Sequence, residues 1–287
     1  MANCPDCGVE NSGSAVYCSK CGQSLETASV PALTSSPAAA PPQPDTASRS
    51  MLVLLHLALL LAILLGFSYI GSEGQQRAVE RYGRLPFYGA TIVWEWLLLA
   101  YVWVGMRRQR LTLAQITGGR WKSAEDVLLD VAVAAGFWLA AVAVLVAVGL
   151  LLGLAQTAPP GHETQPLKEV MKKIGFLAPS TARELIVFLG LAATAGFCEE
   201  IIFRGYLQRT FTTLTRSTFA GMALSAAIFG ASHGYQGAAR MVQIGVFGLM
   251  FGILAHFRKT LRPGMMAHAW HDGIVGVFLF ILQRVLK

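Results

Sequence analysis

The stretch at residues 197–204, FCEEIIFR, sets two carboxylates and a guanidinium into an otherwise apolar run. Charged groups at membrane depth are costly and persist mostly where they line a cavity or pair with one another. Glu200 and Arg204 are four residues apart, so a helix would put them on one face as an ion pair. Glu199 points about 100° around the same helix. It lacks that partner and is a candidate general base. The alternative is that both glutamates only form structural ion pairs.

Two later apolar stretches carry histidines at helical spacing. Phe229 precedes His233 by four residues, and His268 precedes Asp272 by four, so each pair shares one helix face. A single histidine in a membrane helix is more often a packing residue than a catalyst. Two histidines, a glutamate pair and an aspartate on separate apolar segments are hard to explain by packing, and they favour catalytic chemistry.

The three motifs together resemble a known family. Glu-Glu-x-x-x-Arg, Phe-x-x-x-His and His-x-x-x-Asp occur in this order within residues 180–286. They are similar to the motifs of the CPBP family (CAAX proteases and bacteriocin-processing enzymes), intramembrane endopeptidases related to type II CAAX prenyl proteases. In the eukaryotic CAAX proteases the last motif ends in Asn, whereas bacterial members use either residue. The resemblance implies four catalytic residues, Glu199, His233, His268 and Asp272, supported by Glu200, Arg204 and Phe229.

The expected reaction is hydrolysis of a peptide bond in a membrane-associated protein or peptide. Glu199, helped by His233, would activate a water, while His268 and Asp272 would stabilise the oxyanion or orient the substrate. A metal-dependent version, with two histidines and a carboxylate holding a catalytic metal, is open but not favoured. The hypothesis from a different class is a non-proteolytic membrane scaffold or regulator, for example in immunity to a peptide toxin. A scaffold has no need for carboxylates at that depth.

Composition indicates the fold class. Hydrophobic residues make up 54% of the 287 residues and charged residues only 14%, which is typical of a polytopic membrane protein. The formal net charge of +7 is concentrated in short loops between apolar runs, as the positive-inside rule describes. No nucleic-acid partner is therefore expected. We predict an all-α protein with about seven or eight transmembrane helices in the lipid bilayer, preceded by a small zinc-ribbon domain.

The predicted membrane part has three sections. N-terminal transmembrane helices occupy 51–155, a loop with an interfacial amphipathic segment (Leu167–Phe176) occupies 156–183, and the CPBP-like catalytic core occupies 184–287. The expected spans are Met51–Ile70, Gly89–Gly105, Val127–Leu154, 184–212, 217–233, 238–257 and 264–284. His268 follows the preceding turn closely, so a meeting with His233 requires a tilted, shortened or re-entrant helix.

Residues 1–25 carry a separate motif. Two Cys-x-x-Cys-Gly knuckles lie ten residues apart, and four thiolates in two close pairs suit a structural zinc ion. The expected ligands are Cys4, Cys7, Cys18 and Cys21. Two disulfides are the alternative, and they require an oxidising compartment. The sequence shows no DNA-binding surface on this zinc ribbon, so we expect it to contact a protein partner or to act as a sensor. Residues 26–50 are rich in Pro, Ala and Ser, which predicts a flexible linker.

Orientation follows from the basic residues. If seven spans alternate, one side of the membrane receives the arginines and lysines of 107–122, 209–216 and 258–262. That side should be cytosolic, which also places the N-terminus in the cytosol and the protein in the plasma membrane if the source is bacterial. Glu95, alone in the second span, belongs to no motif. We expect it near a helix end or in an internal pair.

Overall fold

The computed structural model describes residues 2–4, 8–12, 46–69, 71–109, 111–155 and 175–285. These residues fall into two compact units, 1–45 and 46–287. In the first, strands β1 (Ala2–Asn3) and β2 (Glu10–Asn11) pair antiparallel, with Ala2 opposite Asn11. Cys4 is buried after β1. Cys7, Cys18 and Cys21, and hence most of the predicted zinc site, lie outside the described residues, so the zinc ribbon stays a prediction.

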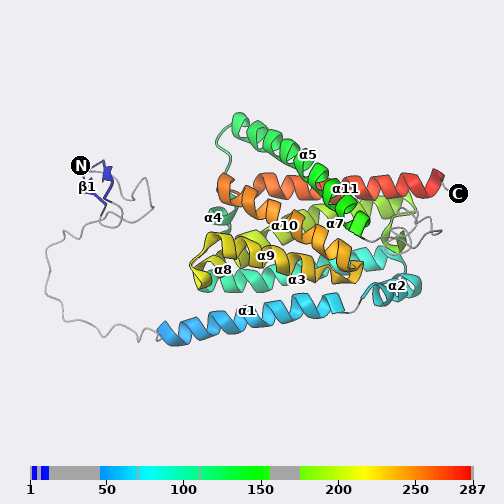
Figure 1. Cartoon of the computed structure of the whole chain (residues 1–287), viewed down its shortest axis with the longest axis horizontal. Coiled ribbons are helices and arrows are strands. Elements are labelled where there is room, and N and C mark those ends of the chain that lie inside the picture. The colour runs from blue at the N-terminus through cyan, green and yellow to red at the C-terminus, as the bar shows by residue number, and fades with distance from the viewer. Residues whose placement is uncertain are drawn as a thin grey trace. The chain divides into compact units, whose positions relative to one another are not determined.

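The second unit consists of helices (Figure 1). In chain order they are α1 (Thr46–Tyr69), α2 (Gly71–Tyr82), α3 (Arg84–Arg108), α4 (Leu113–Thr117), α5 (Ala124–Ala155), η1 (Gly175–Leu177), α7 (Ala182–Glu199), η2 (Glu200–Leu207), α8 (Gln208–Thr215), α9 (Thr218–Ser232), η3 (Gly234–Gln236), α10 (Ala238–Arg258) and α11 (Arg262–Val285).

Six helical segments among the described residues are long and apolar enough to cross a membrane, with α7, η2 and α8 forming one of them. α9 is also apolar but has only 15 residues. All seven expected spans therefore appear as apolar helices, and the span expected at 217–233 is the short α9. Many large apolar side chains on α1, α3 and α5 are exposed, as lipid-facing surfaces require. These findings support an all-α polytopic membrane protein.

Some helices begin before the predicted residue. The last five residues of the predicted linker, 46–50, belong to α1, whereas residues 26–45 lie outside the described part. α7 begins after Thr181, whose side chain accepts from the Glu184 N–H while Glu184 bonds back to Thr181. The predicted amphipathic segment falls almost entirely on residues that are not described.

The helix carrying the glutamate pair is not the continuous α-helix that we predicted for 184–212. After Glu199 it becomes a π-helix, η2, in which the Gln208 N–H donates to the Phe203 carbonyl five residues back. The Phe203 carbonyl also accepts from Ser225 Oγ on α9 at 2.8 Å. π-helical turns are rare and frequently mark functional sites. Here a neighbouring helix supplies a bond that local sequence periodicity cannot reveal.

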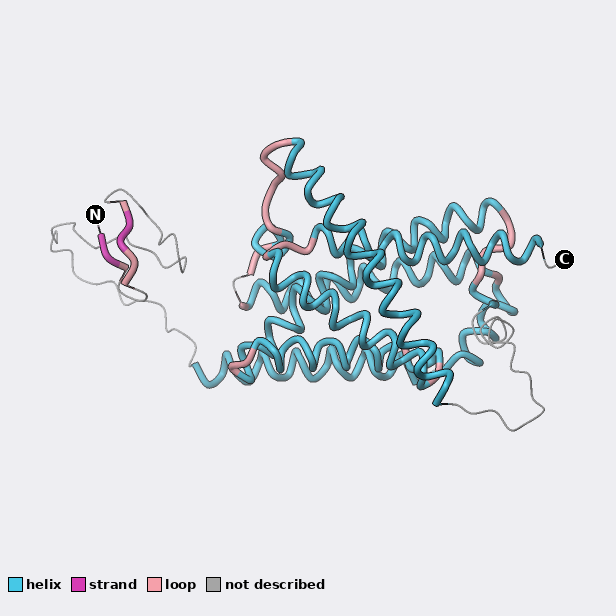
Figure 2. Tube along the Cα trace, turned by 45° about the horizontal axis from the view of Figure 1, so that its top comes forward, coloured by secondary structure: helices cyan, strands magenta, loops and turns pink. Residues whose placement is uncertain are grey.

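Close helix packing around η2 depends on glycine. Figure 2 shows the long helices running side by side, and α7 packs extensively on α11 and α3. A Cβ on Gly196 would lie 2.7 Å from both the Ala269 nitrogen and the Met265 carbonyl oxygen of α11. Only glycine permits that approach, which brings the end of α7 against the first turns of α11.

A buried aspartate holds α5 to the turn between α10 and α11. Asp130 accepts from Arg258 Nη2 at 3.1 Å, and Arg262 Nε lies 2.8 Å from its other oxygen. Trp121 Nε1 donates to Asp130 at 2.8 Å. This cluster fixes one end of the bundle and lies apart from the predicted catalytic residues.

Candidate active site

Glu200 lies at the centre of a buried network. Its Oε1 accepts from Arg204 Nη1 at 2.9 Å, and both side chains are only 1% exposed. The same oxygen lies 3.0 Å from His268 Nδ1. Arg204 Nη2 donates to the Gly248 carbonyl of α10 at 3.0 Å. Because each partner comes from a different turn or helix, the network joins η2, α10 and α11.

This network orients the His268 ring. An ionised carboxylate can only accept, so Nδ1 donates to Glu200 and the other nitrogen, Nε2, faces away from it. His268 Nε2 lies 3.7 Å from Glu199 Oε2 and 3.7 Å from Asp272 Oδ2. Three of the four predicted catalytic residues thus converge, with Glu199 18% exposed and Asp272 35% exposed. Glu199 and Asp272, the carboxylates that face Nε2, are accessible to solvent, whereas Glu200 is buried.

His233 caps the C-terminal end of α9 and belongs to the same neighbourhood. Its Nδ1 lies 2.9 Å from the Phe229 carbonyl oxygen, which can only accept, so Nδ1 carries the proton and Nε2 keeps a lone pair. The Phe229 ring is 5.0 Å from the His233 ring and 6.0 Å from that of His268. His233 is also within electrostatic range of Asp272.

Aromatic rings enclose the charged network. The Arg204 guanidinium lies 4.4 Å from the centroid of Phe229 and 5.2 Å from that of Phe251. The His268 ring contacts Phe247 and Phe251 at 5.9 and 5.4 Å. These rings exclude water from Glu200 and Arg204 and favour the cation by their π faces. Phe229 thereby contacts both histidines and the arginine.

Sequence reasoning assigned no site role to Glu95 or Tyr235. Glu95 on α3 is buried, and its Oε2 has no hydrogen-bond partner among the described residues. It interacts electrostatically with Glu199, His268 and Asp272, so it faces the site. We expected Glu95 near a helix end or in an internal pair, but it lies in the middle of α3 and forms no ion pair among the described residues. Tyr235 on η3 interacts with the same carboxylates. A lone acid in an apolar span was the one sequence signal for Glu95, and Tyr235 gave none.

The candidate catalytic side chains, all of them in the described part of the chain, do not form a metal-binding cluster. Within the described parts of the chain, no three His, Cys, Asp or Glu side chains are grouped so that they could hold a metal ion. His268 Nδ1 is already bonded to Glu200, and His233 Nδ1 to a backbone carbonyl. We therefore derive no step through a catalytic metal.

Comparison with known proteins bears on the same region. Residues 181–274 match the family model of the Rce1-like type II CAAX prenyl endopeptidases. The match supports the CAAX protease family. It covers about a third of the chain and includes Glu199, His233, His268 and Asp272. No curated protein and no solved structure matches the chain. The match to a family of membrane proteases supports a membrane hydrolase acting on membrane-associated substrates.

Proposed function

We propose that this protein is an intramembrane endopeptidase that hydrolyses peptide bonds of membrane-associated substrates. The observation that carries the proposal is the orientation of His268. Its Nδ1 is anchored on buried Glu200, and its Nε2 lies 3.7 Å from both Glu199 and Asp272. A scaffold would be stabilised by the Glu200–Arg204 pair alone. It would have no use for a second layer of accessible carboxylates.

In this proposal Glu199 is the general base. A water held by the Glu199 carboxylate and His233 Nε2 loses a proton to Glu199 as its oxygen attacks the peptide carbonyl carbon. The C–N bond then breaks, and the same proton passes to the leaving amine. The lone pair left on His233 by its bond to the Phe229 carbonyl fits this role. Correctly placed general bases contribute about 10²–10⁴-fold to rate.

His268 is the proposed oxyanion donor. With Nδ1 donating to Glu200 in the neutral ring, Nε2 donates a hydrogen bond only when the imidazole is protonated. Three nearby carboxylates, Glu199, Glu200 and Asp272, favour that cation. A fixed imidazolium beside the attacked carbonyl stabilises the charge that develops on its oxygen. Asp272, four residues on, orients the ring from the open side.

We further propose that Glu95 contacts the substrate backbone. A buried carboxyl oxygen without a partner is costly, and a peptide N–H in the site would satisfy it. Extended substrates expose one such N–H per residue. Glu95 would therefore align the chain and would take no proton from the water.

Terminal proteomics tests the activity on all membrane proteins of a cell at once. Membranes from cells that produce the wild-type protein and from cells that produce Glu199→Gln are compared for new peptide termini. The proposal predicts termini that depend on wild type and vanish in the variant at equal protein level. Identical sets of termini in both would favour the scaffold hypothesis.

For the N-terminal unit we propose a structural zinc ion held by Cys4, Cys7, Cys18 and Cys21. The described part supports a knuckle: the Gly8 N–H donates to the Cys4 carbonyl at 2.9 Å, and Gly8 has φ of 70°, in the left-handed region that favours glycine. Residues 1–45 form their own compact unit. The full chain purified under reducing conditions should carry one zinc, and Cys18→Ser with Cys21→Ser should carry none. A metal-free wild type would contradict this assignment.

We also propose that the N-terminus is cytosolic. The ends of α3, α8 and α10 carry the basic residues, and reduced zinc-binding cysteines require the same compartment. Single cysteines at exposed positions 120 and 216, in a chain without its five native cysteines, should react with an impermeant reagent only after the cells are opened. Labelling of both in intact cells would invert the orientation.

A further inference from the structure

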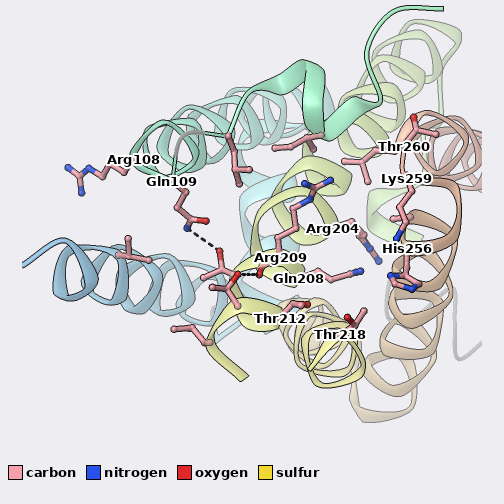
Figure 3. Close-up of a pocket in the computed structure, with 18 of the residues that line it drawn as sticks. Arg108, Gln109, Arg204, Gln208, Arg209, Thr212, Thr218, His256, Lys259 and Thr260 are labelled. Carbon is pink, nitrogen blue, oxygen red and sulfur yellow. Dashed lines mark hydrogen bonds between the residues drawn. The ribbon is translucent and has the colours of Figure 1, made fainter. Parts of the chain in front are cut away.

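A large cavity lies at the end of the bundle that carries the basic residues. Its volume is about 870 Å³, and it is enclosed by α1, the ends of α3, α8 and α10, and the start of α9. Figure 3 shows its residues around α8, with His256 of α10 and Lys259, directly after α10, at one side and Gln109 at the other. None of the predicted catalytic residues lines it. It is therefore a second concave site, distinct from the carboxylate cluster.

The polar lining of the cavity has one sign of charge. Arg108, Arg204, Arg209, His256 and Lys259 line it, together with five threonines and two glutamines, and no Asp or Glu of the described residues does. Such a lining supplies cationic and hydroxyl donors with no competing carboxylate. Phosphate is the anion that this combination of donors recognises best.

Most of these cations lack an internal partner. Arg204 is paired with Glu200, but Arg108, Arg209 and Lys259 form no salt bridge within the described residues. At the same end of the bundle, Arg258 and Arg262 both bind Asp130. The chain thus neutralises two cations beside the cavity and leaves three of those lining it available for an external anion.

The mouth of the cavity faces apolar surface. Leu54 of α1 and Leu214 of α8 line it and are each 48% exposed, and Phe219 and Phe257 beside it are 72% and 76% exposed. Exposed side chains of this kind on membrane-spanning helices face acyl chains. A ligand that fills this space therefore carries an anionic head and an apolar tail.

We propose that this cavity binds the phosphate headgroup of an anionic phospholipid. Arg209 and Lys259 contact the phosphate, the hydroxyls of Thr210, Thr212 and Thr218 donate to its remaining oxygens, and the acyl chains lie over Leu54 and Leu214. Basic pockets between transmembrane helices at the cytosolic face bind anionic headgroups in this manner. Because Arg204 lines both the cavity and the Glu200 network, the bound headgroup stabilises the fold next to the candidate active site.

The test uses the full chain purified in detergent, with phosphatidylglycerol, phosphatidylcholine or inorganic phosphate added. Bound lipid is counted by native mass spectrometry, and the unfolding temperature is measured with each additive. Phosphatidylglycerol should bind the wild type and raise its unfolding temperature, whereas phosphatidylcholine and inorganic phosphate should not. The variant Arg209→Gln with Lys259→Asn should bind phosphatidylglycerol about 30-fold more weakly, as loss of two headgroup contacts implies. Asn tolerates the positive φ of 55° at position 259.

The matched control is Arg107→Gln with Arg120→Gln. It removes two exposed cations near the same end of the bundle, neither of which lines the cavity. The control should keep its phosphatidylglycerol affinity within about twofold of wild type. An equal loss in both double variants would show attraction to the general surface charge and overturn the proposal. So would undiminished binding by the cavity variant, or inorganic phosphate that protects as well as the lipid.

Discussion

Two buried carboxylates, Glu200 and Asp130, are each bound to arginine, yet their surroundings differ. Asp130 binds Arg258, Arg262 and Trp121, and these partners face no other acid among the described residues. Glu200 binds Arg204 and also His268, whose second nitrogen faces Glu199 and Asp272. Ion-pair chemistry alone therefore does not mark a site. A second layer of partly exposed titratable groups, held by the first layer, is what distinguishes the Glu200 region.

The largest expected difference is in catalysis. Glu199→Gln keeps the side-chain shape and removes the base, so cleavage should fall by about 10²–10⁴-fold. The unfolding temperature of this variant should stay near that of wild type. Among the described residues the Glu199 carboxylate forms no hydrogen bond, and its one ion-pair contact, from Oε2 to His268 Nε2, is 3.7 Å long. Cleavage rate and thermal unfolding are measured on the same preparation. A destabilised but active variant would reverse the roles given to the two glutamates.

Glu200→Gln should act on stability. It leaves Arg204 as an unpaired buried cation, which costs about 3–5 kcal/mol in soluble proteins. Low yield or a lowered unfolding temperature is therefore expected before any kinetic defect. The double variant Glu200→Gln with Arg204→Met removes the charge as well and should regain part of the stability. A stable single variant would show that the pair does not hold η2 to α10 and α11.

Asp130→Asn makes the corresponding change in the Asp130 cluster, and its effect can be compared with that of Glu200→Gln. Arg258 and Arg262 are 31% and 17% exposed, so water can solvate them after the charge is lost. The loss of stability should be smaller than for Glu200→Gln, about 1–3 kcal/mol. The cleavage rate per folded molecule should be unchanged. If cleavage were lost while the unfolding temperature stayed unchanged, the Asp130 cluster would contribute to the reaction itself as well as to stability.

The smallest effect is expected at Glu95. Glu95→Gln replaces the carboxyl group with an amide of the same shape and keeps one oxygen acceptor in place. If Glu95 binds the substrate backbone, KM should rise by about two- to tenfold, the value of one hydrogen bond, while kcat changes little. A matching fall in kcat with constant KM would assign Glu95 to the chemical step.

The sequence predicted the apolar helices and the spacing of the acidic and histidine motifs, because both follow from local periodicity. It did not predict η2, whose Phe203 carbonyl accepts a bond from Ser225 on α9, a partner from another helix. The Glu200–His268 contact was equally hidden, because it joins residues 68 positions apart. The sequence did not indicate that Glu95 faces the site, for the same reason. Its neighbours lie on α7 and α11, and no motif in its own span indicates them.

Incorporation of solvent oxygen tests the account most directly. The reconstituted full chain is incubated in H₂¹⁸O with a peptide that terminal proteomics identifies as a substrate, and the products are analysed by mass spectrometry. Wild type should give two fragments with one ¹⁸O in the new carboxyl terminus, since water is the nucleophile, and Glu199→Gln should give neither fragment. Fragments at the wild-type rate from Glu199→Gln, or products without ¹⁸O, would contradict hydrolysis by a Glu199-activated water.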